Sequence, residues 1–171
     1  MYREQTVAVV IPAHNEALLL PVTLDGLPDF VDNIIVVDDA SSDATAEIAH
    51  GHSRPKICVL THAINQGVGG AIVTGYRHAL TLGSDLVVVV GADAQMDPEE
   101  MTALLDPLVE GRADYAKGDR LGHPDLVQLM PAVRLFGNRV LTALTRWSSG
   151  YRHVRDSQCG YAAMTGDALA A

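Results

Sequence analysis

The stretch that most constrains the fold is LVVVVGADAQMDP, residues 86–98, where an uncharged apolar run ends abruptly in acidic and amide side chains. Such a run is typical of a strand buried in a parallel sheet, and open α/β sheets bind ligands at the carboxyl ends of their strands. Asp93, Gln95 and Asp97 follow at that end, and their oxygen atoms suit Mg²⁺ or Mn²⁺ better than Zn²⁺.

Asp97 has a simpler explanation, because it precedes Pro98, Glu99 and Glu100 and so fits the cap of the next helix. Nothing in helix capping requires Asp93 or Gln95. These two residues are therefore the predicted metal ligands, and a loop that only caps the helix is the alternative.

Apolar, β-branched runs alternate with segments compatible with helix through the first two thirds of the chain. The expected strands are 7–11, 33–37, 56–60, 114–117 and the run that begins at Leu86. The expected helices are 21–27, one that is capped by Ser42 or Asp43 and runs through Ile48, 69–82, and one that ends near Val109. Alternation at these lengths favours βαβ units, so we predict an α/β fold with a mostly parallel sheet and helices on both faces.

Polar clusters follow four of the five expected strands, and parallel strands would bring all four clusters to one edge of the sheet. Each cluster has a structural explanation of its own: Asn15 can cap a helix, Asp38 can bind backbone amides, and the glycines can turn the chain. Their convergence favours one shared ligand site. The clusters are Asn15 with Glu16, Asp38 with Asp39, 65–70, and 93–97.

The remainder of the chain has a different sequence pattern. Apolar residues recur every three or four positions from Leu126 to Trp147, which predicts one long amphipathic helix. Packing of this stripe on the sheet is the simplest expectation, and a surface for lipid or for a partner subunit is the alternative. Residues 155–171 are polar and contain glycine, and we expect a short helix after Gly166.

Composition excludes several classes of function. The 171 residues carry a net charge of −9, which argues against a nucleic-acid-binding surface and against simple electrostatic docking on anionic lipid. We find no transmembrane run and no export signal, so we expect a cytoplasmic protein. Cys58 and Cys159 form no metal-binding pattern. We interpret His14, His62 and His123 as solvated loop residues.

Familiar nucleotide-binding motifs are a poor match. GVGGAI has isoleucine where a dinucleotide fingerprint needs its third glycine, and no Walker A lysine motif is present. The adjacent acids Asp38 and Asp39, with Lys117, also fit the acidic pocket of a phospho-receiver domain. That interpretation gives no role to IPAHNE or to the last fifty residues.

The motifs, taken in order, resemble family 2 glycosyltransferases of the GT-A fold, particularly the dolichyl- and polyprenyl-phosphate hexose synthases. Six blocks carry the resemblance across nearly the whole chain: IPAHNE, VVDDASSDAT, NQGVGGA, GADAQMDP, KGDR and DSQCGY. The resemblance implies one GT-A (Rossmann-like) domain over residues 1–171, with a nucleotide-binding half over about 1–98 and an acceptor-side half over about 99–171. The nucleotide-sugar-binding residues that it implies are Pro12, Ala13, Asn15, Glu16, Asp38, Asp39, Asn65, Gly67 and Arg120.

The resemblance also implies a reaction: metal-dependent, inverting transfer of a hexose from a UDP- or GDP-sugar to a polyprenyl phosphate or related acceptor. Asp93 and Gln95 would hold Mg²⁺ or Mn²⁺ on the diphosphate, which neutralises charge on the leaving group. Asp156 is our candidate for the base, and a role in orienting its loop is the alternative. Arg134 and Arg139 would hold an acceptor phosphate, with peripheral contact at the cytoplasmic face of the membrane.

Two departures from the family pattern bear on activity. The family usually has an acid where this chain has Gly91, so one metal-binding carboxylate is missing. The family also continues beyond the DSQCGY block, so we expect this chain to be short at its C-terminal end, and a fragment or an inactive copy stays open. The other functions considered are a sugar nucleotidyltransferase, which AHNE after the first strand disfavours, and a receiver-like or nucleotide-binding module without turnover.

Overall fold

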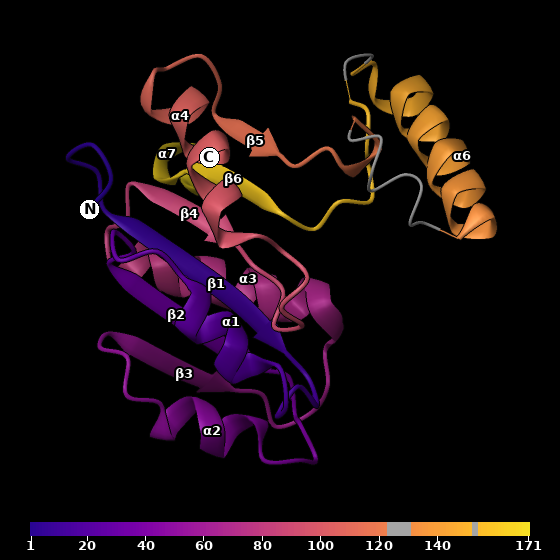
Figure 1. Cartoon of the computed structure of the whole chain (residues 1–171). Coiled ribbons are helices and arrows are strands. Elements are labelled where there is room, and N and C mark those ends of the chain that lie inside the picture. The colour runs from indigo at the N-terminus through magenta and orange to yellow at the C-terminus, as the bar shows by residue number, and fades with distance from the viewer. Residues whose placement is uncertain (123–130, 152–153) are drawn as a thin grey trace. The chain divides into compact units, whose positions relative to one another are not determined.

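Four of the predicted strands form the parallel centre of a six-stranded sheet (Figure 1). They are β1 (Val7–Ala13), β2 (Asn33–Asp38), β3 (Ile57–Thr61) and β4 (Leu86–Val89). The order across the sheet is β3-β2-β1-β4-β6-β5, where β5 spans Tyr115–Lys117 and β6 (Ala162–Thr165) runs antiparallel to its neighbour β4. The expected α/β fold with a mostly parallel sheet is therefore confirmed.

The computed structural model describes residues 1–122, 131–151 and 154–171. The described residues form two compact units. We call residues 1–116 with 161–171 the sheet unit and residues 117–160 the helix unit, and each is described by itself. The predicted loop residue His123 lies outside the described residues, as do Leu126, Leu129 and Met130 of the predicted amphipathic helix.

Strand β6 corrects the sequence analysis, which expected no strand between residue 155 and Gly166. Its sequence, AAMT, has little intrinsic preference for strand, and the strand forms through pairing with β4, where Ala162 lies opposite Val89 and Thr165 opposite Leu86. The expected short helix follows directly as α7 (Gly166–Ala170), and the Thr165 hydroxyl caps it by accepting the Ala168 N–H at 3.2 Å.

Helices cover both faces of the sheet, with α3 (Gly67–Thr81) on one face and α1 (Leu20–Gly26) on the other (Figure 1). Gly75 of α3 lies directly on β1, and a Cβ atom there would come within 2.2 Å of Val10 Cγ1. The glycine therefore permits the close approach of α3 to the sheet. The core cluster on this face consists of Ala8, Val10, Ile35, Val37, Ala71, Ala79 and Val87.

The predicted helix boundaries agree with the structure to within a few residues, and the predicted caps agree in part. Asp97 accepts the Glu99 N–H at 2.9 Å and opens a 3₁₀ turn, η1 (Pro98–Glu100), that leads into α4 (Met101–Val109). Ser42 caps no helix, because α2 (Thr45–Gly51) begins later and has Ala44 at its N-cap. Asp43 instead accepts the Thr45 N–H at 3.0 Å.

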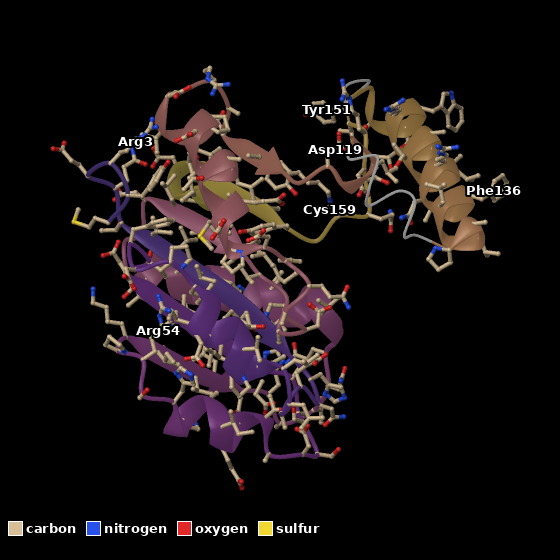
Figure 2. All side chains as sticks on the ribbon, in the orientation of Figure 1. Arg3, Arg54, Asp119, Phe136, Tyr151 and Cys159 are labelled. Atoms are coloured by element: carbon tan, nitrogen blue, oxygen red, sulfur yellow. The ribbon has the colours of Figure 1, made fainter. Side chains whose placement is uncertain are left out.

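The helix unit contains η2 (Arg120–Gly122) and α6 (Ala132–Ser149); within this unit the apolar stripe is exposed, and its packing on the sheet stays a prediction. Val133, Phe136 and Trp147 are 86%, 71% and 86% exposed, and Figure 2 shows Phe136 projecting outward from α6. The side of α6 that is buried carries Asn138 and Thr142. Thr142 accepts the Ser157 N–H at 3.2 Å, so polar contacts hold this side of the helix.

Candidate functional site

A left-handed backbone residue occurs in each loop that follows a parallel strand. Asn15, Ala40 and Ala94 have φ angles of 57°, 56° and 53°, and Gly67 opens α3 at 78°. This conformation costs a residue with a side chain about 1–2 kcal/mol, and such strain concentrates at functional sites. Three of the six described non-glycine residues with positive φ thus lie where the sequence places the polar clusters, and the other three, Arg3, Glu4 and Lys56, precede strands.

Asn15 joins the loops after β1 and β2. Its Oδ1 accepts hydrogen bonds from the Ser42 N–H at 2.8 Å and the Ser42 hydroxyl at 3.1 Å. Its own N–H donates to Ser41 Oγ at 3.0 Å, and the Glu16 N–H donates to Thr45 Oγ1 at 2.8 Å. Asn15 caps no helix, because α1 has Leu19 at its N-cap without a side-chain bond. The structure thus brings together two of the predicted clusters.

Asp39 and His62 join the loops after β2 and β3. Asp39 Oδ1 accepts the Gln66 N–H at 2.8 Å and lies 2.7 Å from His62 Nδ1. The other ring nitrogen, Nε2, lies 2.9 Å from Thr74 Oγ1 of α3. His14 links the same group of loops, since its Nδ1 lies 2.8 Å from the Asp39 carbonyl oxygen and 3.2 Å from Asn65 Nδ2.

His62 corrects the prediction of a solvated loop residue, because it is 9% exposed and bonded at both ring nitrogens. Its N–H donates to the Asp38 carbonyl oxygen at 2.9 Å, which extends the pairing of β2 with β3 and places the imidazole beside Asp39. A signal for this role is present in the sequence. A buried acid at the end of one strand needs donors, and the histidine directly after the neighbouring strand can supply one.

The Asp39 environment favours a carboxylate. Burial alone raises the pKa of Asp39, but the Gln66 N–H, the hydrogen bond and charge of His62, and the Gly67 N–H together lower that pKa below its ordinary value. An ionised carboxyl accepts hydrogen bonds and donates none. Asp39 is therefore suited to a ligand that presents N–H or O–H groups.

Asp38 lies directly beside this group and is 2% exposed. Its Oδ1 is fully buried and accepts no hydrogen bond from the part of the chain that the structure describes. The expected alternative, that Asp38 binds backbone amides, is thus not supported for this oxygen. A buried acceptor without a donor is costly, so a bound water or ligand that donates a hydrogen bond to this atom would stabilise it.

The loop after β4 is held by its own contacts. Asp93 Oδ1 accepts the Gln95 N–H at 3.2 Å, and the Ala94 N–H donates to Thr23 Oγ1 at 3.1 Å. Gly91 contributes by leaving space, because a Cβ atom there would lie 2.9 Å from Asp93 Oδ1. A larger residue at position 91 would require the Asp93 side chain to move.

The donor atoms of this loop fit a hard divalent cation that shares its ligands with a substrate. Among the described residues, no three His, Cys, Asp or Glu side chains are arranged to hold a metal ion. Mg²⁺ is commonly bound by one or two protein oxygens together with water and substrate phosphates. Asp93 and Gln95 can supply two such oxygens, whereas one oxygen of Asp97 already accepts the Glu99 N–H.

Asp156 and the predicted arginines belong to the helix unit. Asp156 is 2% exposed, and its Oδ1 accepts the Gln158 N–H at 3.0 Å. This bond fits the alternative role of Asp156, in which it orients its loop. The role of Asp156 as a base stays a prediction. Arg139 is exposed on α6. The side chains of Arg120 and Arg134 lie outside the described part of the chain.

Comparison with known proteins identifies the family to which this chain belongs. Residues 8–170 match the family model described as Glycosyl transferase family 2. The UDP-N-acetylglucosamine–dolichyl-phosphate N-acetylglucosaminyltransferase of Methanococcus voltae is 32% identical, over 97% of this chain and 72% of the relative. The undecaprenyl-phosphate mannosyltransferase of Micrococcus luteus is also 32% identical, over 87% of this chain and 66% of the relative.

A solved structure agrees with the fold. It is glucosyl-3-phosphoglycerate synthase from Mycobacterium tuberculosis in complex with Mn²⁺, UDP-glucose and phosphoglyceric acid. The TM-score is 0.66 at 26% identity, and the match covers 96% of this chain and 58% of the solved chain. The expected GT-A architecture is thereby confirmed, and the chain spans between about half and three quarters of the length of these relatives.

Proposed function

Because this chain belongs to glycosyl transferase family 2, we propose that it serves in the transfer of a hexose from a UDP- or GDP-sugar to a polyprenyl phosphate. The observation that carries the proposal is the hydrogen-bonded group at the carboxyl ends of β1, β2 and β3. This group holds the ionised Asp39 and the unsatisfied Asp38 oxygen at one edge of the sheet. Nucleosides present N–H and hydroxyl donors that such oxygens accept.

The nucleoside is assigned to the sheet unit. Asp39 accepts from the base, and the buried Asp38 oxygen accepts from a further donor of the ligand. Asn15 and Asn65 hold the surrounding loops in place through Ser42 and the Gly67 N–H, at 2.8 and 2.9 Å. Pro12, Ala13 and Glu16 belong to the same segment and stay predicted binding residues.

Asp93 and Gln95 are the residues that would hold Mg²⁺ or Mn²⁺. A divalent cation supplies positive charge for the diphosphate as it leaves, which matters on a chain with a net charge of −9. The M. tuberculosis relative contains Mn²⁺ together with UDP-glucose, which supports this assignment. Arg120 is proposed to lie near the same phosphates.

The acceptor is assigned to the helix unit. Both curated relatives described above are named for transfer to dolichyl or undecaprenyl phosphate, and a phosphate anion can be held by Arg134 and Arg139. No helix in the described ranges has the length and hydropathy to cross a bilayer. Because its apolar stripe is exposed, α6 is proposed to lie in the interfacial layer, at the cytoplasmic face of a membrane that contains the lipid acceptor.

A transfer assay tests the proposed function. Purified protein is incubated with Mn²⁺, undecaprenyl phosphate in detergent, and radiolabelled UDP- or GDP-hexoses. We expect label to move into the organic phase with one donor class. In the Asp156→Asn variant we expect transfer to fall at least about a hundredfold with little change in donor affinity, the loss typical of an acid–base residue.

The outcomes separate the alternatives. Nucleotide binding without transfer would contradict the enzymatic proposal and favour a nucleotide-binding module. Absence of both binding and transfer would contradict the donor site itself. Full transfer by Asp156→Asn would remove Asp156 from catalysis and leave it the loop-orienting role that its bond to Gln158 indicates.

A further inference from the structure

The two oxygens of the Asp39 carboxylate are in different situations. Oδ1 accepts the Gln66 N–H at 2.8 Å and contacts His62 Nδ1 at 2.7 Å, so both of its lone pairs are in use. Among the described residues, both hydrogen bonds of normal geometry to this carboxylate go to Oδ1, and the nearby Gly67 N–H, which also lowers the Asp39 pKa, donates its hydrogen bond to Asn65 Oδ1 at 2.9 Å. The carboxylate therefore presents one free acceptor.

His62 fixes this asymmetry. An ionised carboxylate can only accept, so the proton of this contact lies on His62 Nδ1. The other ring nitrogen, Nε2, lies 2.9 Å from the Thr74 hydroxyl, which ties the imidazole to α3. The His62 and Asp39 side chains are only 8% and 4% exposed, so water competes little with this chain of hydrogen bonds.

The number of free oxygens distinguishes the two candidate bases. The pairing edge of uracil has one donor, N3–H, between two carbonyl oxygens, so a carboxylate meets it with a single oxygen. The pairing edge of guanine has two adjacent donors, N1–H and the N2 amino group, which a carboxylate meets with both oxygens. With Asp39 Oδ1 occupied, a guanine would leave one buried donor without a partner.

We propose that His62 is a positioning residue that holds Asp39 with only Oδ2 free, and that the site thereby selects a uracil nucleotide over a guanine nucleotide. The inference rests on the proposed function, because it takes Asp39 as the residue that binds the base. It deepens that function by assigning the donor to the UDP-sugars and by naming the residue that sets the choice.

The test is calorimetric titration of the purified chain with UDP and with GDP, both in the presence of Mn²⁺. We expect the wild-type protein to bind UDP at least about tenfold more tightly than GDP. His62→Ala should weaken UDP binding about tenfold. It should also bring the UDP and GDP affinities closer together, because Asp39 Oδ1 loses its contact with His62 and can accept a donor from guanine. His62→Asn should restore most of the UDP affinity and most of the preference for UDP over GDP, since the Asn amide nitrogen can replace Nδ1 as the donor to Asp39.

Two further variants separate positioning from folding. His50→Ala changes an exposed histidine on α2 and should leave both affinities at the wild-type value. Thr74→Val keeps the volume of Thr74 but removes the hydroxyl that holds His62, and it should narrow the UDP/GDP ratio even if His62→Ala fails to fold. Thermal melting of each variant checks that the fold is intact.

The possible results are distinguishable. Wild-type protein that binds GDP as tightly as UDP would overturn the inference and leave the proposed function standing. An unchanged ratio in folded His62→Ala and Thr74→Val would overturn the positioning role. Wild-type protein that binds neither nucleotide would overturn the proposed function, and the inference with it.

Discussion

Asp93 and Asp97 lie four residues apart in one loop, yet the structure gives them different roles. One oxygen of Asp97 accepts the Glu99 N–H at the turn that leads into α4. Among the described residues, Asp93 accepts a hydrogen bond within its own turn, from the Gln95 N–H. The sequence analysis separates the two residues in the same way, because a proline and two glutamates identify the cap. The role of Asp93 in metal binding stays a prediction.

We expect Asp93→Asn to weaken Mn²⁺-dependent binding of UDP at least about tenfold, because the variant removes the single carboxylate proposed to hold the cation. Asp97→Asn is the matched control. It should lower the free energy of unfolding by less than about 1 kcal/mol, as for an altered helix cap, and leave metal dependence in place. Isothermal titration with and without Mn²⁺ measures both, and unchanged metal dependence in Asp93→Asn would exclude it as a ligand.

Asp39 should make stability depend on pH. Its pKa in the folded protein lies below the ordinary value of 3.8, so its stabilising contribution is complete well above that value and is lost as the pH falls through the folded pKa. We expect Asp39→Asn to lower the free energy of unfolding by about 1.5–3 kcal/mol at neutral pH and by much less near pH 2. Urea unfolding at both pH values measures this, and an equal loss at both would contradict the assignment.

The local pattern around His62 predicts a solvated residue, and the signal for its burial appears only when the neighbouring strand end, with Asp39, is considered. The position of His62 between a strand and a glycine-rich loop is typical of a solvated residue, and the burial arises from Asp39 and Thr74, which are distant in the sequence. Asn15 was identified as a site residue because its polar cluster follows a strand. The partners that hold it, Ser41 and Ser42, could be found only from the packing of the neighbouring loop.

At the scale of elements, local patterns predict the four parallel strands and their helices well. Apolar runs mark β1, β2 and β4, which are buried, and β3, which is half-buried, and proline and glycine residues mark several helix ends. Strand β6 was missed because its two buried alanines gain their environment from β4. The long helix was predicted correctly in type, but amphipathic periodicity does not identify what covers its apolar face.

Helix α6 provides the prediction at this scale. The exposed Phe136 and Trp147 should insert into phosphatidylcholine vesicles that contain undecaprenyl phosphate. Replacement of both by serine should reduce co-sedimentation with these vesicles at least about tenfold, because each ring contributes roughly 2 kcal/mol when buried. Val73→Ser, at a half-exposed position of α3, is the control and should bind as the wild-type protein does.

Two results would contradict the membrane role of α6. The wild-type protein would remain in the supernatant, or the double variant would sediment equally with vesicles. Sedimentation velocity without lipid adds a further distinction. A dimer that the same two substitutions dissociate would show that a second copy of the chain covers this face instead.

At the scale of the whole molecule, the predicted residues divide between the two units. The sheet unit carries the residues proposed to bind the nucleoside and the metal, and the helix unit carries those proposed for the acceptor and the base, together with Arg120. The family match spans both, over residues 8–170. The division predicts that nucleoside binding is a property of the sheet unit and does not require the acceptor.

Hydrogen–deuterium exchange with and without UDP and Mn²⁺ tests most directly the claim that four strand-end loops form one donor site. We expect slower exchange in all four loops together, at 13–17, 39–45, 62–68 and 91–97, with little change in α4 or α6. Protection confined to a single loop, or located in the helix unit alone, would contradict a shared site at the carboxyl ends of β1 to β4.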